Sequence, residues 1–238
     1  MIDDPCLRRG PTTSQQGSDR WDMCHKDSTK WCSVKSPTAP LLAFGLQCSI
    51  QAIGIGRDIA KALVKCGAQT AVLSRTQEDL DSLKAECPEL ETCCVDLNDW
   101  SKAQATVESL GHFDLLVNNA GVSRVGPFLE VKEEDIDHVF KTNFKGLFNV
   151  SQVVARSMVA KKSGGAIVNL SSAASTQALH DHAVYCSAKG AVDSLTTVMA
   201  LELGPHKLFI LQTWTLEIAP RQGRSSEVLL CSGNLVCK

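Results

Sequence analysis

The segment Gly165-Ala-Ile-Val-Asn-Leu170 is a short apolar run, and a longer stretch with helical spacing, residues 182–203, follows it. A strand followed by a long helix is the repeating unit of a parallel β-sheet. The same alternation extends over residues 41–207, where Phe113-Asp-Leu-Leu-Val117 has the apolar density of a buried strand. The pattern therefore predicts an α/β fold made of βαβ units around one parallel sheet.

The positions of the elements follow from the same spacing. We predict strands at residues 69–74, 90–95, 113–117 and 165–170. We predict helices at residues 57–66, 76–86, 100–110, 133–160 and 182–203. Thr76 and Asp79 form a candidate capping pair for the second helix, and Gly204-Pro205 should end the last one.

The two ends of the chain differ from its centre. Residues 1–40 are rich in Ser, Thr, Asp, Lys and Pro and have no sustained period, which predicts a disordered leader. Residues 208–238 break the alternation and form an atypical C-terminal segment. The predicted domain is therefore residues 41–207.

Composition argues against several classes of protein. The 238 residues suffice for one α/β domain, and a net charge of −2 offers no basic surface to nucleic acid or an anionic membrane. No apolar run reaches the about 18 residues of a transmembrane helix. The eleven scattered cysteines indicate reduced thiols rather than a disulfide framework. Cys24-His25 with Cys32 lacks a convincing fourth ligand, so we predict no metal site.

The first residues carry no secretory signal, because Asp3, Asp4, Arg8 and Arg9 precede any apolar stretch. A mitochondrial targeting segment would be rich in arginine and poor in acidic residues, which fits this stretch badly. We therefore predict a cytoplasmic protein and favour the mitochondrion less.

Tyr185 and Lys189 stand four residues apart in Tyr-Cys-Ser-Ala-Lys, and Ser172 lies thirteen residues upstream of the tyrosine. Residues i and i+4 share one face of a helix, so the phenol and the ammonium can face one cleft. The pKa of a free phenol is about 10, and a fixed cation beside it favours the phenolate. The serine hydroxyl can then hold a carbonyl or alcohol oxygen against the tyrosine. On a surface helix the same spacing usually has no function, so the rest of the chain decides.

Gly54-Ile55-Gly56 lies at the start of the first predicted helix. Glycines there let the backbone approach a pyrophosphate, and the helix N-terminus supplies donors, although a tight turn would give the same pattern. The next strand ends at Ser74-Arg75, where the adenosine ribose of a dinucleotide would lie. The planar fork of arginine suits the 2′-phosphate of NADP better than the 2′-hydroxyl of NAD. A solvated arginine at a strand end is the alternative.

Polar residues follow two further strands. Asp96 comes directly after the strand at residues 90–95, and Asn118-Asn119-Ala120-Gly121 follows the strand at residues 113–117. Open α/β sheets bind ligands at the carboxyl ends of their strands, where all these residues are predicted to lie. Asp96 can accept a hydrogen bond from the adenine amino group, and the amide run can brace the sheet and a cofactor. An ordinary strand-end turn is the alternative for the amide run.

The motifs along residues 54–207 resemble those of the short-chain dehydrogenase/reductase family in content and order. They are Gly-Ile-Gly, Asp96-Leu97, Asn-Asn-Ala-Gly, Asn143, Ser172 and Tyr-x-x-x-Lys. Segments such as Pro127-Phe-Leu-Glu-Val131 look most like the L-xylulose (dicarbonyl) and tetrameric carbonyl reductase branch of that family. The resemblance implies a single Rossmann-type, doubly wound parallel sheet and a homo-oligomer. It also implies NADPH-dependent reduction of small ketoses, α-dicarbonyls or other carbonyl compounds.

The resemblance also implies roles for individual residues. Tyr185 would donate a proton to the carbonyl oxygen, Lys189 would lower the pKa of the tyrosine and hold the nicotinamide ribose, and Ser172 would orient the substrate oxygen. Asn143 would anchor a water that links Lys189 to solvent. His182, one turn before the tyrosine, would face the substrate or else be a plain surface histidine. The implied NADP(H) contacts are Gly54, Ile55, Gly56, Ser74, Arg75, Asp96, Leu97, Asn118, Ala120, Gly121, Tyr185 and Lys189.

Two segments depart from the family's pattern. Ile50 stands where the family has the first glycine of Thr-Gly-x-x-x-Gly-Ile-Gly, and a β-branched residue resists the positive φ of a tight turn. Residues 208–238 replace a strand, a substrate lid and a last edge strand. We expect one strand there, with no lid and a sheet incomplete at its C-terminal edge. The alternatives to an active enzyme are a catalytically dead, reductase-like interaction partner and an unstable splice product.

Overall fold

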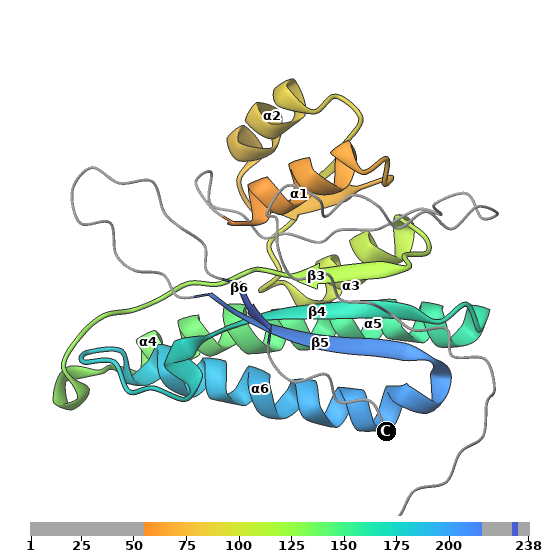
Figure 1. Cartoon of the computed structure of the whole chain (residues 1–238). Coiled ribbons are helices and arrows are strands. Elements are labelled where there is room, and N and C mark those ends of the chain that lie inside the picture. The colour runs from red at the N-terminus through yellow and green to blue at the C-terminus, as the bar shows by residue number, and fades with distance from the viewer. Residues whose placement is uncertain (1–54, 216–229, 233–238) are drawn as a thin grey trace, which may run out of the picture. The chain divides into compact units, whose positions relative to one another are not determined.

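The computed structural model of the chain describes residues 55–215 and 230–232 (Figure 1). Its strands are β1 (Ala71–Ser74), β2 (Glu91–Cys94), β3 (Leu115–Asn118), β4 (Gly165–Ser172), β5 (Leu208–Thr215) and β6 (Leu230–Ser232). Its α-helices are α1 (Ile55–Lys65), α2 (Gln77–Glu86), α3 (Trp100–Ser109), α4 (Glu133–Phe140), α5 (Leu147–Lys161) and α6 (Ala183–Leu203). The predicted leader, residues 1–40, and the Gly54 and Ile50 predictions lie outside the described residues.

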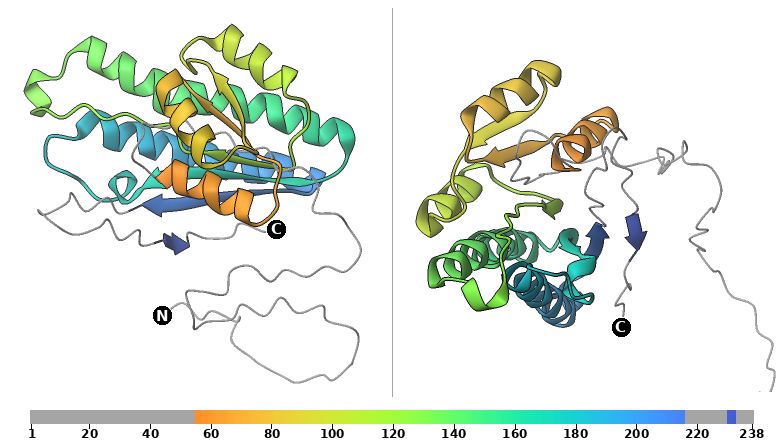
Figure 2. Two further views of the ribbon diagram at one scale, coloured as in Figure 1. Left: turned by 90° about the horizontal axis from the view of Figure 1, so that it is seen from above. Right: turned by 90° about the vertical axis from the view of Figure 1, so that its left-hand side faces the viewer.

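Parallel strands dominate the sheet structure. Within the described residues, β1 pairs with β2, and a second ladder runs β3-β4-β5-β6. The β1–β2, β3–β4 and β4–β5 pairs are parallel, and β4 pairs with β5 over its full length, from Gly165 opposite Leu208 to Ser172 opposite Thr215. Figure 2 shows the strands and helices from two further sides. Parallel pairing sends the carboxyl ends of β3, β4 and β5 to the same edge.

Two apolar cores cover opposite faces of the strands. Leu116 and Ile167 pack with residues of α3, α5 and α6, whereas Val117 and Leu170 pack with residues of α1 and α2. Successive side chains of a strand point to opposite faces, so neighbouring residues of β3 enter different cores. Helices on both faces of parallel strands confirm the predicted α/β fold. Within the described residues the strands form two ladders instead of the single parallel sheet that was predicted.

The helix predicted at residues 133–160 changes type in its middle. Between α4 and α5, the backbone of Lys141–Gly146 is π-helical. Thr142, Asn143 and Gly146 of this segment are buried, and a side chain on Gly146 would press on Leu97, whose Cβ would lie 3.1 Å from the added atom. The wider turn therefore brings the helix against the segment that follows β2. π-Turns inside helices are rare and often mark functional sites.

The predicted capping pair before α2 does not form. Thr76 occupies the cap position, but its side chain makes no capping hydrogen bond. Instead, the Thr76 N–H donates to the Ser74 hydroxyl at 3.3 Å. The buried Ser74 side chain shapes the turn after β1 in this way, and Arg75 is the residue at that turn.

The C-terminal segment supplies more sheet than predicted. The apolar run at residue 208 forms the expected strand, β5, and Leu230–Ser232 adds a second, antiparallel strand at its edge. Leu230 and Cys231 end a four-residue apolar run, residues 228–231, which is too short for its period to distinguish a strand from other structure, so the pattern does not predict β6. The sheet thus extends one strand beyond the predicted edge.

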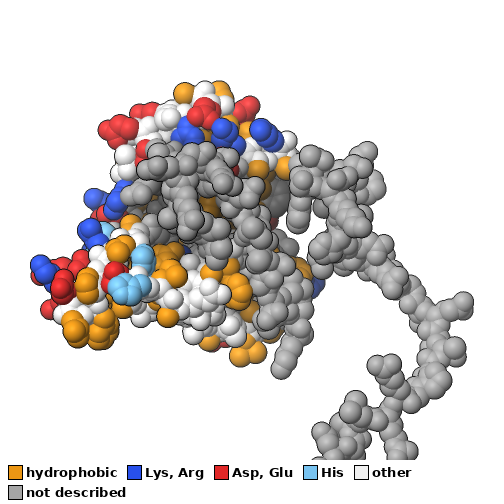
Figure 3. Space-filling view, turned by 60° about the vertical axis from the view of Figure 1, so that its left-hand side comes forward, with side chains coloured by type: hydrophobic (Ala, Val, Ile, Leu, Met, Phe, Trp, Pro, Cys, Tyr) orange, Lys and Arg blue, Asp and Glu red, His pale blue; other side chains and the backbone are white. Residues whose placement is uncertain are grey.

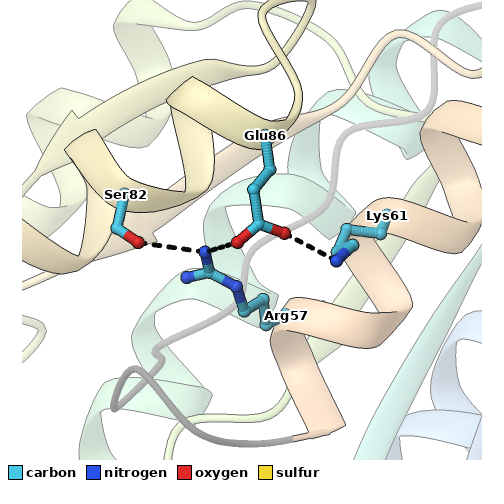
Figure 4. A network of polar contacts seen from close by, with 4 residues as sticks. All are labelled: Arg57, Lys61, Ser82 and Glu86. Carbon is cyan, nitrogen blue, oxygen red and sulfur yellow. Dashed lines mark hydrogen bonds and ion pairs between the residues drawn. The ribbon is translucent and has the colours of Figure 1, made fainter.

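A charged network joins α1 to α2 (Figure 4). The Glu86 carboxylate accepts hydrogen bonds from the Arg57 guanidinium and, at 2.6 Å, from the Lys61 ammonium. Arg57 also donates to the Ser82 hydroxyl at 3.1 Å. The hydrogen bonds from Lys61 and Arg57 lower the pKa of Glu86 from 4.5 to about 2, and the bond to Glu86 raises the pKa of Lys61.

We predict that Glu86→Gln lowers the melting temperature at pH 7 by a few degrees, since the network loses its anion. The pKa of Glu86 in the folded chain is below its ordinary value of 4.5, so its contribution is complete above about pH 4.5 and disappears as the pH falls through about 2. Melting curves of both proteins between pH 7 and 2 should therefore converge at the acid end. Glu89→Gln, which changes an exposed glutamate near the end of α2, is the matched control. An equal loss in both variants would contradict the prediction.

The described residues contain neither a membrane-spanning helix nor a cluster of metal-ligating side chains. None of the helices there is long and apolar enough to cross a membrane. Within the same residues, no group of three or more His, Cys, Asp and Glu side chains could hold a metal ion. Cys24, His25 and Cys32, for which the sequence predicts no metal binding, lie outside that part of the chain.

Candidate active site

A cleft of about 670 Å³ lies where β1, β3 and β4 end. Residues that follow these strands, the first residue of α1 and the first turns of α6 line it. The lining includes the cations Arg75, Arg124 and Lys189 and the imidazoles of His138 and His182. No aspartate or glutamate is among the described residues that line the cleft. Its electrostatic character therefore favours an anionic ligand.

Lys189 is a buried cation on α6 that faces this cleft. Its side chain is only 5% exposed, and its Nζ donates to the carbonyl oxygen of Leu170 at 2.7 Å. The same Nζ lies 5.8 Å from the centre of the Tyr185 ring, one helical turn away. The i, i+4 spacing thus brings the ammonium beside the phenol, as predicted, and β4 holds the ammonium there.

Ser172 reaches the cleft from the last residue of β4. It is 8% exposed, and its Oγ accepts a hydrogen bond from the Ala174 N–H at 3.2 Å. That bond caps the short 3₁₀ helix of Ala173–Ser175. Ser172, Tyr185 and Lys189 line one cleft, which is the arrangement that the sequence predicts.

Asn143 lies next to the cleft without lining it. Its side chain is fully buried and forms two bonds with the backbone of Val122: Oδ1 accepts from the N–H at 2.8 Å, and Nδ2 donates to the carbonyl at 2.9 Å. Gly121 lies between this amide and Lys189, since a Cβ placed on Gly121 would be 3.8 Å from both Asn143 Oδ1 and Lys189 Nζ. The π-helical segment therefore braces the loop that forms one wall of the cleft.

His182 precedes α6 and contacts the tyrosine. Its ring meets the Tyr185 ring edge-on, with 6.4 Å between the ring centres. Its Nδ1 lies 2.7 Å from the carbonyl oxygen of His180. A ring nitrogen beside a carbonyl oxygen carries the proton, so Nδ1 donates and the other nitrogen, Nε2, is left to face the cleft or solvent.

Of the residues predicted to contact the phosphates and the adenosine ribose of a cofactor, Ile55 and Arg75 line the cleft. Ile55 is the first residue of α1, where helix N–H groups have no partner within the helix. Arg75 has an exposed side chain, and its carbonyl oxygen accepts a weak bond from the Cys94 thiol at 3.6 Å. Gly56 is buried in α1 and does not line the cleft.

Other predicted cofactor contacts have hydrogen-bond partners within the protein. Asn118 is buried and donates to Ser151 Oγ and to Asn169 Oδ1, both at 2.8 Å, so its amide joins β3 to α5 and β4. Asp96 accepts from the N–H of Asn98 at 2.9 Å. Predicted residues that do not line the cleft are Gly56, Ser74, Asp96, Leu97, Asn118, Ala120 and Asn143.

Several lining residues were not singled out from the sequence. Asn119 lies within the predicted amide run, and Ser171 adjoins Ser172, so their strand-end positions are a usable signal. Arg124 and His138 come from the loop after β3 and from α4. The sequence gives no motif for these two residues, because they reach the cleft only through the tertiary packing of α4 and the loop before it.

The segment between β3 and α4 exposes large apolar side chains. Val125 is 67% exposed, Phe128 76% and Leu129 93%, and apolar side chains reach the surface on the face drawn in Figure 3. Contiguous apolar surface of this kind often marks a contact with another molecule. The homo-oligomer expected from the sequence stays a prediction.

Comparison with curated proteins gives relatives with reductase names. The chain is 55% identical over 155 residues to D-erythrulose reductase of Gallus gallus, a match that covers 65% of this chain and 63% of the relative. It is 51% identical over 173 residues to L-xylulose reductase of Mesocricetus auratus, covering 73% and 71%. It is 45% identical over 172 residues to carbonyl reductase (NADPH) 2 of Sus scrofa, covering 72% and 70%. The match with the first of these relatives thus spans less than two thirds of its length.

The fold and the family model agree with these relatives. A solved structure of an NAD⁺-bound xylitol dehydrogenase superimposes with a TM-score of 0.69 at 27% identity, over 73% of this chain and 69% of that one. The model of the short chain dehydrogenase family matches residues 51–214, which is more than half of the chain. The chain therefore belongs to the short-chain dehydrogenase family.

Proposed function

We propose that this chain reduces small carbonyl compounds, such as ketoses and α-dicarbonyls, with NADPH as the hydride donor. The observation that carries the proposal is the meeting of Ser172, Tyr185 and Lys189 in one cleft that also contains Arg75. The names of the similar curated proteins, which are reductases of erythrulose, xylulose and carbonyl compounds, support the same reaction class.

The residues of the cleft fit a dinucleotide. Helix N–H groups begin at Ile55, cationic Arg75 stands at the end of β1, and no described carboxylate lines the cleft, so a phosphate-bearing ligand meets donors and cations but no repulsion. The arginine fork at the ribose end favours NADP over NAD. When bound, the cofactor supplies the hydride.

The protein then supplies alignment and a proton. Tyr185 donates its phenolic proton to the carbonyl oxygen as that oxygen gains negative charge. Lys189, held by the Leu170 carbonyl, stabilises the resulting phenolate. Ser172 donates a hydrogen bond to the substrate oxygen and orients it towards the phenol. Water relay through the Asn143 region stays a prediction.

NADPH binding to the purified full chain, followed by NADPH oxidation with a panel of ketoses and α-dicarbonyls, tests the proposal. We expect micromolar binding and carbonyl-dependent loss of absorbance at 340 nm. NADPH binding without turnover of any carbonyl would overturn the proposal that the chain is an active reductase. The alternative of a catalytically inactive interaction partner would then remain. Absence of binding by a folded, monodisperse chain would overturn the cofactor site itself.

Arg75→Asp should reverse the choice of cofactor. Loss of a charge-assisted bond to the 2′-phosphate, with a carboxylate in its place, is expected to lower the ratio of kcat/KM for NADPH to that for NADH by about 100-fold. The two ratios come from steady-state kinetics at fixed carbonyl concentration. Arg156→Asp, an exposed arginine of α5 outside the cleft, is the control for net charge. An unchanged ratio in the Arg75 variant would show that its side chain does not touch the phosphate.

A further inference from the structure

The end of β4 is tied to one face of α6 by consecutive polar contacts. Asn169 Nδ2 donates to Thr196 Oγ1 at 2.9 Å, and the carbonyl of the next residue, Leu170, accepts from Lys189 Nζ at 2.7 Å. The residue after that, Ser171, donates its hydroxyl to Asp193 Oδ1. Three successive residues of β4, directly before Ser172, are therefore each bonded to α6.

The partners on α6 recur at helical spacing. Tyr185, Lys189, Asp193 and Thr196 are separated by four, four and three residues, so they lie along one face of the helix. Two of these four are the proposed acid and cation. Asp193 occupies the next position along the same stripe, yet it does not line the cleft.

The bond between Ser171 and Asp193 is the one in this series whose acceptor is a carboxylate. Ser171 is 1% exposed and lines the cleft beside Ser172. Its hydroxyl also lies 3.4 Å from the carbonyl oxygen of Lys189. A hydroxyl that donates to a carboxylate forms a stronger bond than a neutral pair does, and this bond is partly buried. The single hydroxyl proton of Ser171 therefore goes to Asp193, and the Lys189 carbonyl is a more distant neighbour.

We propose that Asp193 is a positioning residue that acts through Ser171 and holds Ser172 in register with Tyr185 and Lys189. The proposal rests on the proposed reductase function. The carboxylate keeps the last residues of β4 at a set distance from α6, and the Leu170 carbonyl keeps its place at the lysine ammonium. A displacement of about 1 Å between reacting groups can lower a rate by about 100-fold.

The test compares Asp193→Ala, Asp193→Asn and Ser171→Ala in the full chain. We expect Asp193→Ala to lower kcat by about 10- to 100-fold and to leave the Kd for NADPH within about threefold of wild type, because Asp193 does not line the cleft. Asparagine still accepts the serine hydrogen bond, so Asp193→Asn should recover most of the rate. The double variant Ser171→Ala/Asp193→Ala should be no slower than either single variant, since both remove one bond.

Thr196→Val is the matched control. Thr196 is buried on the same stripe, and its hydroxyl bonds to Asn169, but it stands farther from the cleft. It should lower the melting temperature and leave kcat near wild type. An unchanged kcat in Asp193→Ala would overturn the proposal. An equal loss of kcat in Thr196→Val would also overturn it, because the effect would then come from general stability. An equal loss in Asp193→Asn would overturn it as well, because the effect would then come from the charge.

A second readout keeps the proposal testable if the wild-type chain turns over no carbonyl. Tyr185 is the sole tyrosine of the chain, so absorbance at 295 nm follows the ionisation of its phenol directly. Among the described residues, the other ionisable side chains that line its cleft are Arg75, Arg124, His138, His182 and Lys189.

If Asp193→Ala loosens Lys189, the phenolate loses part of its stabilising cation, and the phenol should ionise at higher pH. If the variant only removes the negative charge of Asp193, the phenolate meets less repulsion, and the phenol should ionise at lower pH. A shift to higher pH in Asp193→Ala, absent in Asp193→Asn, supports positioning. A shift to lower pH, or no shift, overturns it. Failure of turnover with this shift present would count against the reductase and not against the role of Asp193.

Discussion

Tyr185→Phe is expected to lower the kcat of carbonyl reduction by about 10²- to 10⁴-fold, which is the usual contribution of a general acid. The phenyl ring keeps the volume of the side chain and its edge contact with His182, but it has no proton to donate. Cofactor affinity should change little, because the phosphate end of the cleft is formed by other residues. Steady-state kinetics and quenching of tryptophan fluorescence by NADPH measure the two quantities separately.

Cys186→Ser controls for disturbance of the same helical turn. Cys186 is the half-buried neighbour of the tyrosine, and its thiol has no role in the proposed chemistry. This variant should keep the wild-type kcat. Retained turnover in Tyr185→Phe would remove the phenol from the mechanism and leave a water or Ser172 as the proton donor.

Lys189→Met should lower kcat by about 10²-fold or more and move the ionisation of Tyr185 to higher pH. Methionine has nearly the length of lysine, but it carries no charge and cannot donate to the Leu170 carbonyl. The phenolate then loses the cation that lies 5.8 Å from its ring centre. Titration of absorbance at 295 nm detects the shift in the sole tyrosine.

Lys189→Arg separates the charge from its exact placement. The guanidinium keeps the positive charge beside the ring, so the ionisation of the phenol should stay closer to wild type than in Lys189→Met. Its different shape should still reduce kcat, since it cannot occupy the ammonium site at Leu170 in the same way. If the methionine variant titrates like wild type, Lys189 does not stabilise the phenolate.

The sequence predicts the order and type of most elements, because apolar periodicity reports which face of an element is buried. The helix predicted at residues 133–160 shows a feature that apolar periodicity cannot predict. Periodicity does not distinguish the π-helical Lys141–Gly146 from the α-helix on either side, since the buried face continues through it. The contact that accompanies the wider turn, between Asn143 and the backbone of Val122, joins residues 21 positions apart and leaves no local pattern.

Some features of the candidate site could likewise be predicted from the sequence, and others could not. The i, i+4 spacing of Tyr185 and Lys189 is fixed by helical geometry and could be predicted. The acceptor for Lys189, the Leu170 carbonyl, is a backbone group of another element, and backbone groups carry no sequence signal. Asp96 accepts a hydrogen bond from the Asn98 N–H, as an aspartate in a turn commonly does, and its contact with an adenine stays a prediction.

The placement of Ser172 and Tyr185 on different kinds of element has a consequence for local unfolding. β4 pairs with a strand on each side over Ala166–Asn169, so its amides should exchange with solvent only on large-scale opening. Tyr185 is the third residue of α6, and the first N–H groups of a helix have no partner within it. Hydrogen exchange should therefore be slow in the part of β4 that leads to the serine and fast around the phenol. A ligand that settles in the cleft would slow exchange mainly in the first turn of α6, which makes that turn the sensitive reporter of occupancy.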